Sequence, residues 1–511
     1  MVTPATKISS NVTSLYYCVE DSIKTVSGDE VWKPLEPNTY DDFGGETTLI
    51  AREPINANRQ LKKGVITDLD ASGGFSTDVT LENLQDLGQG FFFAALRKKD
   101  ELAVTDTDTT LDDYQPASGG DGYVAKDLLF AKGFDDSANN GLKEVTGTPS
   151  ATSVEVAGEL VTATTQTGTI SRVGFEFGSA EVDIDVSGTL PKLSRVGGTK
   201  DMTDFGLIPG EYVFIGGDTA PMKFVGANNN GFCRVRSVAT TYIEFDKTDA
   251  TMTNETGTAL TIRIFFGRVL KNETGGSIVR TSYQLERQLG AEDTAIPANI
   301  QSEYLTGAIP NELTITAATA SKLEASMQFV GLDHELRTGV QGIKAGTRQA
   351  LVESNAFNTS SDISKIKLAT VVAGSANPSA LFAYATDLTI TVNNNVTPDK
   401  ALGVLGGFEA SHGNFTVGGE LEAYFADTAS VSAVRNNADI TLEVHYVKAN
   451  AGISLDMPLL ALGDGRLNVT KDEAIKIPLS KQAASGAAVH STLNHTLLMV
   501  FWDYLPTLAD T

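Results

Sequence analysis

Short runs of alternating apolar and polar residues dominate the chain. Residues 211–215, 233–238 and 242–245 are examples, and turns rich in Gly and Asn separate them. A period of two is typical of β-strands. Apolar residues recur at helical spacing in residues 82–97, and a shorter helix is predicted at residues 428–436. We therefore predict a mainly β fold of the sandwich or barrel type, with few helices.

A long hairpin is predicted immediately before the first helix. Residues 47–55 form its first arm, and a charged stretch follows with Arg59, Lys62 and Lys63. The chain then turns at Gly73-Gly74 and enters a second strand, residues 75–81. The basic residues lie before this turn, in the first part of the hairpin.

The same order of strand, polar excursion, turn, strand and helix returns at residues 387–436. Ile50 then matches Ile390, Phe75 matches Phe415, Leu81 matches Leu421 and Glu82 matches Glu422, at a spacing of 340 positions (415 − 75 = 340). A solenoid would repeat every 20–50 residues or so. Repetition at this much longer spacing predicts two copies of one domain within the chain.

This repeat suggests a division of the chain into five parts. We expect an N-terminal arm at residues 1–40, the first part of the first domain copy at 41–144 and an inserted β-rich segment at 145–200. A small barrel-like lobe at 201–275 completes or decorates the first copy, and residues 276–511 form the second. The length of 511 residues is ample for several separate cores.

Charge and cysteine content narrow the range of functions. The net charge is −25, from 64 acidic and 39 basic residues, so the average surface repels phosphate. Acidity also serves solubility alone. Cys18 and Cys233 form no C-x-x-C motif, which fits a reducing compartment. The longest apolar run near the end, residues 497–502, is too short to span a bilayer, so we expect a soluble, cytoplasmic chain without membrane contact.

Motifs of catalysis and cofactor binding are missing from the sequence. Its five histidines include no H-E-x-x-H, and His490 and His495 are poorly spaced for two metal ligands on one element. No G-x-S-x-G or phosphate-loop motif occurs, and Gly88-Gln89-Gly90 is followed by Phe93 where a dinucleotide fingerprint requires Gly. We predict no catalytic residues, no cofactor and no metal.

Two acidic stretches superficially resemble a calcium-binding site and a catalytic pair of carboxylates. Residues 68–73 begin like a calcium-binding loop, but position twelve is Val79 instead of the bidentate Glu. Asp112 and Asp113 lie in a low-complexity loop, where no packed surroundings are expected to shift their pKa values. A turn and a solvated loop are the better interpretations.

Residues 47–60 (TTLIAREPINANRQ) and 73–81 (GGFSTDVTL) resemble the opening of tail tube proteins of long, non-contractile-tailed bacteriophages (siphoviruses). Four later segments are similar to the same family in the same order: residues 231–238 (GFCRVRSV), 282–287 (SYQLER), 388–395 (LTITVNNN) and 415–425 (FTVGGELEAYF). Each motif is weak alone, and their shared order carries the resemblance. The extra sequence at residues 145–267 departs from the simplest members of the family.

The resemblance implies a structural virion protein and no enzyme. Family members form rings of sixfold symmetry whose hairpins join edge to edge into a β-barrel, and the rings stack into the tube through which the genome leaves the virion. A chain with two tube domains would close such a ring as a trimer, although a hexamer stays open. The implied partners are copies of the chain and the tape measure, tail terminator and distal tail proteins. The implied location is the virion tail, assembled in the host cytoplasm, with DNA passing through the lumen without specific binding.

Two sets of residues become candidates for assembly and for the lumen. The charged hairpin residues Arg52, Arg59, Lys62, Lys63, Asp68 and Asp70 are expected at contacts between rings, unless they form only a solvated hairpin tip. In the second copy, the hairpin residues Thr389, Thr391, Asn393, Asn395, Lys400 and Glu409 are expected to line the lumen.

Two other classes of protein fit the same sequence. One is another β-rich tail, baseplate or fibre subunit, although the repeated hairpin and helix favour a tube. The other is a carbohydrate-binding or carbohydrate-active β protein, because glycosidase acids follow no fixed motif.

Overall fold

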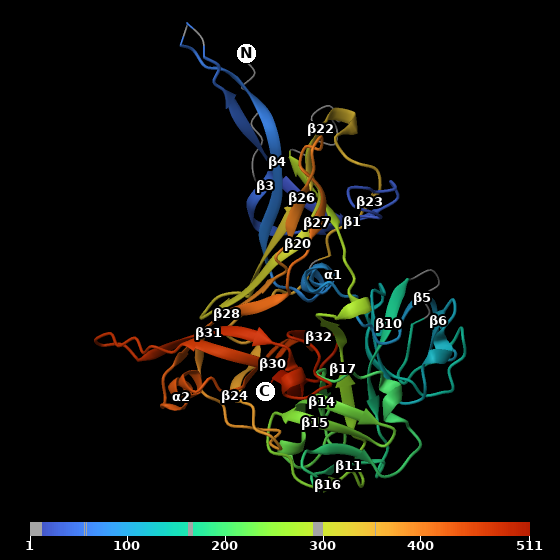
Figure 1. The fold of residues 1–511 in the computed structure, drawn as a ribbon. Coiled ribbons are helices and arrows are strands. Elements are labelled where there is room, and N and C mark those ends of the chain that lie inside the picture. Colours follow the sequence, from blue (N-terminus) through green and yellow to red (C-terminus); the bar gives the residue numbers. More distant parts are fainter. Residues whose placement is uncertain are drawn as a thin grey trace. The chain divides into compact units, whose positions relative to one another are not determined.

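The computed structural model describes residues 13–510, apart from residues 56, 58, 162–166, 290–299 and 353. Figure 1 shows a chain built mainly of β-strands, which confirms the predicted fold class. Two compact units are present, and each is assembled from three separate stretches of chain. Unit 1 contains Met1–Ala94, Glu273–Phe357 and Asp387–Glu420; unit 2 contains Ala95–Asn272, Asn358–Thr386 and Leu421–Thr511.

The described residues form two α-helices, α1 (Leu81–Phe92) and α2 (Ala429–Arg435). Thr80 caps α1: its side chain accepts a hydrogen bond from the Asn83 N–H, and the Asn83 side chain accepts one from the Thr80 N–H. Phe93 ends the helix in a left-handed conformation, with φ of 47°. The predicted helix at residues 82–97 is therefore confirmed but ends earlier.

Strands of the first domain copy pair in the order β1-β19-β20-β21-β4-β3, all within unit 1. Their bounds are β1 (Thr13–Val19), β3 (Pro37–Arg52), β4 (Lys62–Asp78), β19 (Tyr283–Leu289), β20 (Gln301–Ala318) and β21 (Glu324–Gly331). The short strands β2 (Val31–Leu35), β22 (Asp333–Thr338) and β23 (Thr347–Arg348) extend the same unit.

The second copy repeats this pairing order with its own strands, as β24-β29-β30-β31-β28-β25. Their bounds are β24 (Ile363–Thr370), β25 (Ala385–Asn393), β28 (Thr416–Tyr424), β29 (Ile440–Lys448), β30 (Ala451–Asp464) and β31 (Lys476–Ala484). Between β25 and β28 the chain forms a small hairpin, β26 (Thr397–Lys400) with β27 (Gly407–Ser411). In unit 2, β30 also pairs with β32 (Leu498–Trp502), which pairs with β18 (Arg268–Lys271).

Hydrogen bonds fix how the copies correspond, residue by residue. The Val79 N–H donates to the Leu323 carbonyl at 2.9 Å, and the Phe425 N–H donates to the Ile475 carbonyl at 3.0 Å. The β4-to-β28 spacing is therefore 346 positions (425 − 79 = 346), and the β21-to-β31 spacing is 152 (475 − 323 = 152). The predicted duplication is present, but the predicted spacing of 340 is wrong by six. An even error keeps the inward and outward positions of a strand in phase, so the hydrophobic pattern still matched.

An insertion of two small β lobes interrupts the first copy after Ala94, within unit 2. The first lobe contains β5 (Glu101–Asp108), β6 (Asp113–Pro116), β7 (Asp127–Lys132), β8 (Gly141–Glu144), β9 (Val154–Glu155) and β10 (Gly168–Glu176). The second contains β11 (Val182–Asp185), β12 (Lys192–Arg195), β13 (Tyr212–Ile215), β14 (Gly231–Ala239), β15 (Tyr242–Thr248), β16 (Glu255–Thr256) and β17 (Arg263–Phe266). Each lobe has its own apolar core.

These lobes are themselves related by duplication. The Asn140 side chain accepts from the Phe134 N–H at 3.1 Å and donates to the Phe134 carbonyl at 2.7 Å. The Asn230 side chain makes the same two bonds to Phe224, at 3.0 and 2.9 Å. The sequence carried this signal as two Asn-Asn-Gly motifs, at residues 139–141 and 229–231, which our sequence analysis missed.

The parts of the chain are divided differently from the sequence prediction. Residues 13–40, assigned to an arm, form β1, β2 and the start of β3, and Trp32 is fully buried in unit 1. Residues 1–12 lie outside the described residues. The insertion covers both the predicted segment 145–200 and most of the predicted lobe 201–275. The sequence prediction assigned β19 to β21 to the second copy. They pair instead with β1 and β4 of the first copy, and because these partners are distant in sequence, the local pattern did not reveal the pairing.

Candidate functional site

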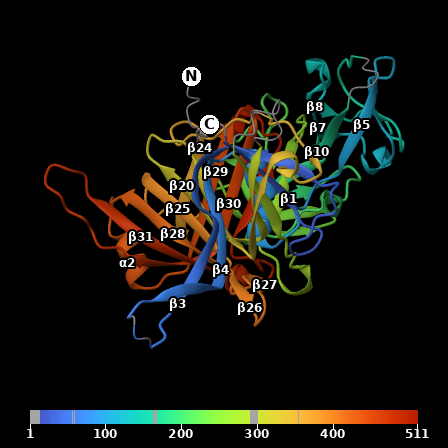
Figure 2. The same ribbon diagram turned by 90° about the horizontal axis from the view of Figure 1, so that it is seen from above.

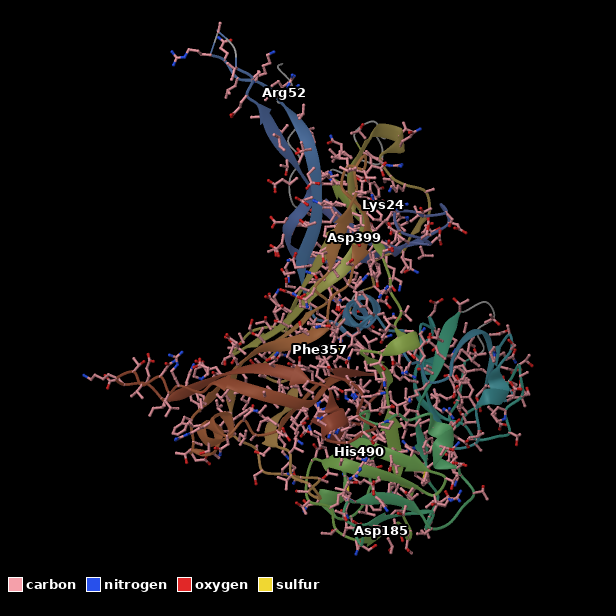
Figure 3. All side chains as sticks on the ribbon, in the orientation of Figure 1. Lys24, Arg52, Asp185, Phe357, Asp399 and His490 are labelled. Carbon is pink, nitrogen blue, oxygen red and sulfur yellow. The ribbon has the colours of Figure 1, made fainter. Side chains whose placement is uncertain are left out.

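The hairpin of β3 and β4 projects beyond the other strands of its unit (Figure 1). Its two arms pair from Pro37 opposite Thr77 to Arg52 opposite Lys62. Figure 3 labels Arg52 on this projecting part. Among the described strands, β3 pairs only with β4, so its outer edge has no strand partner, although the Arg287 side chain donates to the Phe43 carbonyl at 3.2 Å.

Four of the predicted assembly residues, Arg52, Arg59, Lys62 and Lys63, are exposed on this hairpin. The acidic pair Asp68 and Asp70 lies closer to its base. Lys400 of β26 binds both carboxylates at 2.5 Å within unit 1, and its hydrogen bond lowers the pKa of Asp68. The structure thus separates the predicted set into basic residues exposed on the hairpin and acidic residues already bound by a cation of the same chain.

The hairpin also carries exposed apolar side chains that sequence reasoning did not single out. Leu49 faces Ile66 and Ile50 faces Val65 across the two strands, and these four side chains are 50–63% exposed. Consecutive apolar residues place apolar groups on both faces of a two-stranded ribbon, which buries neither. This departure from strict alternation was the signal in the sequence. A ribbon that is apolar on both faces favours a protein partner over solvent.

A polar face covers the sheet of unit 1 on the side opposite its core. Leu388, Ile390 and Val392 of β25 are buried, and the alternate residues Thr389, Thr391 and Asn393 point to the other face. Neighbouring strands add Asp41, Asp78, Glu312, Thr314, Thr316, Glu324, Ser326 and Gln328. Three of the predicted lumen residues therefore lie on one continuous face rich in hydroxyl groups and carboxylates.

The other three predicted lumen residues lie elsewhere. Asn395 is in the turn after β25, while Lys400 and Glu409 belong to the separate two-stranded sheet of β26 and β27. Figure 3 labels Asp399, which pairs with Glu409 in that sheet. The structure therefore does not bring these three together with Thr389, Thr391 and Asn393 on the polar face.

The two copies are joined within unit 1 by strand pairing. Residues 312–318 of β20 pair antiparallel with residues 387–393 of β25, from Glu312 opposite Asn393 to Ala318 opposite Asp387. Figure 2 shows β20, β25 and β28 running side by side. Ile315 and Ala317 are buried at this junction, at 2% and 6% exposure. We call this pairing the internal joint.

Among the described residues, the equivalent segments of the two copies have no strand paired with them at this edge. Adding the spacing of 152 places the counterparts of residues 312–318 at residues 464–470, after β30. Leu467 matches Ile315 and is 38% exposed, and Val469 matches Ala317 and is 73% exposed. The counterpart of β25 is β3, whose outer edge has no strand partner among the described strands. One half of a joint is thus exposed in each copy.

Unit 2 contains a buried group of charged residues between the second lobe and the second copy. Arg234 bonds Asp456 at 3.0 Å, and Lys247 lies 3.6 Å from Glu443. Burial alone would raise the pKa values of both carboxyl groups. Lys247 and Lys365 instead hold the pKa of Glu443 well below its usual range, and Arg234 and Lys247 do the same for the pKa of Asp456. The arrangement joins the second lobe to the second copy through paired charges.

No group of three or more His, Cys, Asp or Glu side chains in the described part of the chain could hold a metal ion. None of the described helices is long and apolar enough to cross a membrane.

The chain is similar to a known protein family. A family model with the description "phage tail tube protein" matches residues 10–483. Comparison with curated proteins found no match. The matched range covers most of the chain, including both copies and the insertion.

Proposed function

This chain belongs to the phage tail tube proteins, and from this premise we propose that three copies of it close each ring of the tube of a long, non-contractile tail. The observation that carries the proposal is the internal joint. Within one chain it pairs the first copy with the second, and each chain exposes the two remaining halves of the same joint. Three chains with two domains each then satisfy the sixfold symmetry that the family resemblance implies.

The register of the joint between chains follows from the internal joint. Residues 464–470 of one chain take the place of residues 312–318 of β20, and β3 of the next chain takes the place of β25. Each pairing satisfies backbone groups that are free in the single chain. Leu467 and Val469 would become buried, as Ile315 and Ala317 are at the internal joint.

The polar face of the sheet becomes the lumen wall in this arrangement. Its carboxylates and hydroxyl groups, together with the net charge of −25, deny DNA phosphates the basic partners that counterion release requires. DNA would then slide through the tube without being held. Thr389, Thr391 and Asn393 keep their assignment to the lumen under this proposal.

The projecting hairpin is assigned to contacts between successive rings. Its apolar residues would supply most of the free energy of the contact between rings. Its basic residues would set the orientation of the hairpin against the next ring and the salt dependence of the contact. Because Lys400 already binds Asp68 and Asp70, the acidic partners of the four basic residues are sought in other parts of the adjacent ring.

Reversing the charge of the hairpin tests its role. The triple variant Arg59→Glu, Lys62→Glu, Lys63→Glu should fold and form rings but fail to polymerise, because like charges meet at the ring interface. Negative-stain electron microscopy would show single rings with a central hole in place of tubes. A control variant with Lys98→Glu, an exposed residue of the insertion, should still form tubes. Tubes of normal length from the triple variant would contradict the assignment.

The remaining parts of the proposal follow from the same assembly. The chain is a structural component of the virion tail without catalytic activity, assembled in the host cytoplasm. Its partners beyond itself are the tape measure protein inside the tube and the terminator and distal tail proteins at its ends.

A further inference from the structure

We propose that the segment before β1, residues 1–12, of one chain docks on the second copy of the neighbouring chain, at a socket formed by Phe425 and Ile475. This inference rests on the proposed ring and adds a second contact to each joint between chains. The contact exchanges an arm between subunits.

The first copy shows how such a segment docks. The chain between the copies runs along unit 1, where Thr347 and Arg348 pair with β2. Phe357 then inserts beside the first-copy socket, Val79 and Leu323. Its N–H donates to the Val79 carbonyl at 3.2 Å, and its carbonyl accepts from the Leu323 N–H at 2.9 Å. Phe357, labelled in Figure 3, is only 2% exposed, so it completes the core at this end of the copy.

The second copy has the same socket without an occupant among the described residues. The Phe425 N–H donates to the Ile475 carbonyl, as Val79 donates to Leu323. Within the described part of unit 2, nothing donates to the Phe425 carbonyl or accepts from the Ile475 N–H. Ile475 is 37% exposed, whereas its counterpart Leu323 is 1% exposed. Tyr384 and Tyr424, whose backbones are hydrogen-bonded to each other beside the socket, are 74% and 43% exposed.

Strand pairing identifies the segment that matches Phe357. Val19 pairs with Tyr283, which pairs with Ala308; in the second copy Thr370 pairs with Ile440, which pairs with Leu460. Ala308 and Leu460 are separated by the spacing of 152 found above. The β1-to-β24 spacing is therefore 351 (370 − 19 = 351) from Lys365 onward, and a bulge between Ile363 and Lys365 makes it 350 at Ile363. Aligned without a gap in sequence, Phe357 corresponds to Thr6.

The sequence itself supports the alignment without a gap. Residues 9–13 are Ser-Ser-Asn-Val-Thr, and residues 360–364 are Ser-Ser-Asp-Ile-Ser, at the same spacing of 351. The residues that precede β1 are thus the repeat counterpart of those that precede β24. They are expected to bind the counterpart of the surface on which Phe357 docks.

Side-chain sizes at the two sockets are complementary. The first copy combines Val79 and Leu323 with the large Phe357. The second combines the large Phe425 and Ile475 with the small Thr6. The aromatic ring has moved from the docking segment to the socket, which keeps the total volume similar and leaves room for the arm.

Chain order determines which molecule supplies the arm. The docking segment of the internal joint precedes the second copy and binds the copy before it. The segment that precedes the first copy should likewise bind the copy before it, and in a ring that copy is the second copy of the adjacent chain. The same adjacent chain offers residues 464–470 to β3, so both contacts belong to one joint.

A disulfide trap tests the proposal on assembled rings. The variant Thr6→Cys, Ile475→Cys should form disulfides between chains on mild oxidation. Under the proposal, Thr6 and Ile475 are bonded as Phe357 and Leu323 are, and two residues in that arrangement lie within the reach of a disulfide. A denaturing, non-reducing gel should show covalent species of two and three chains. Cys18 and Cys233 are buried and remain as background. The control Thr6→Cys, Leu336→Cys places the second thiol at an exposed site in the first copy and should stay monomeric.

Hydrogen exchange separates this inference from the proposed ring. In rings, the amides of residues 464–470 and of Ile475 should both be protected, and deletion of residues 1–8 should expose Ile475 alone. Rings without linked chains, a disulfide within one chain, or unchanged protection of Ile475 after the deletion would overturn the arm exchange and leave the ring intact. Absence of rings would overturn both proposals.

Discussion

At the residue scale, the least predictable part of the molecule is the buried charge cluster of unit 2. Arg234 and Lys247 lie on neighbouring strands of the second lobe, and Glu443 and Asp456 lie on β29 and β30. In the sequence each is one polar residue in an ordinary β pattern. Their meeting depends on how a lobe packs against a domain copy about 200 residues away, which local periodicity does not encode. Burying them is tolerated because each charge has an opposite partner.

His445, in the same cluster, gives a pH prediction. Its ring stacks on Phe232 at 4.1 Å, and burial lowers its pKa from 6.5 to about 3. Between these values the unfolded state holds a proton that the folded state lacks, so acidification destabilises the fold by at most about 1.4 kcal/mol per pH unit. Glu443 and Asp456 act in the same direction below their ordinary pKa values, because only the folded state holds them ionised there.

The variant His445→Phe should therefore flatten the pH dependence of stability between pH 6.5 and 4. Calorimetric melting of the unassembled chain across this range measures the slope. Ser454→Ala is the matched control, because it removes the hydroxyl bonded to His445 Nδ1 at 2.7 Å but keeps the titrating imidazole. An equal slope in His445→Phe and the unaltered chain would refute the role of His445.

At the element scale, the sequence predicted the first helix and the presence of a hairpin before it, because apolar spacing and alternation are local signals. The predicted turn at Gly73-Gly74 is wrong, because both glycines lie within β4 and the chain turns between Arg52 and Lys62. It did not predict the length of β20, whose first half pairs with β19 and whose second half pairs with β21 and β25. Nor did it distinguish Thr389 on the sheet from Lys400 on the separate β26 hairpin. Both limits have the same cause, because strand partners far apart in sequence are not visible in a single chain's pattern.

Substitutions after β30 test the pairing between chains. Leu467→Asp and Val469→Asp should each abolish ring formation, because the joint would bury an unpaired carboxylate. Asn468→Asp is the matched control, since Asn468 corresponds to Thr316, which points to the polar face. The isolated chains should fold equally well in all three variants, since these positions are exposed. Size-exclusion chromatography with light scattering measures the outcome, and rings from Leu467→Asp or Val469→Asp would exclude the proposed register.

At the scale of the whole molecule, duplication organises the chain twice, once in the tube domains and once in the inserted lobes. The first duplication was detected from the order of hairpin, turn and helix, although its spacing was six residues too short. The second escaped because its loops differ in length and only the Asn-Asn-Gly turns are alike. Domain boundaries were the least accurate part, since the first copy is interrupted by an insertion and resumes at Glu273.

The mass of the isolated ring tests the central claim most directly. Each chain has a mass of 54.1 kDa and supplies two tube domains, so a closed ring of three chains should weigh about 162 kDa (3 × 54.1). Native mass spectrometry of rings from the triple hairpin variant, which are prevented from stacking, gives this number without interference from tubes. A mass of three chains is the expected result. A ring of six chains would show that the two copies do not occupy equivalent places around the lumen, and would contradict the account.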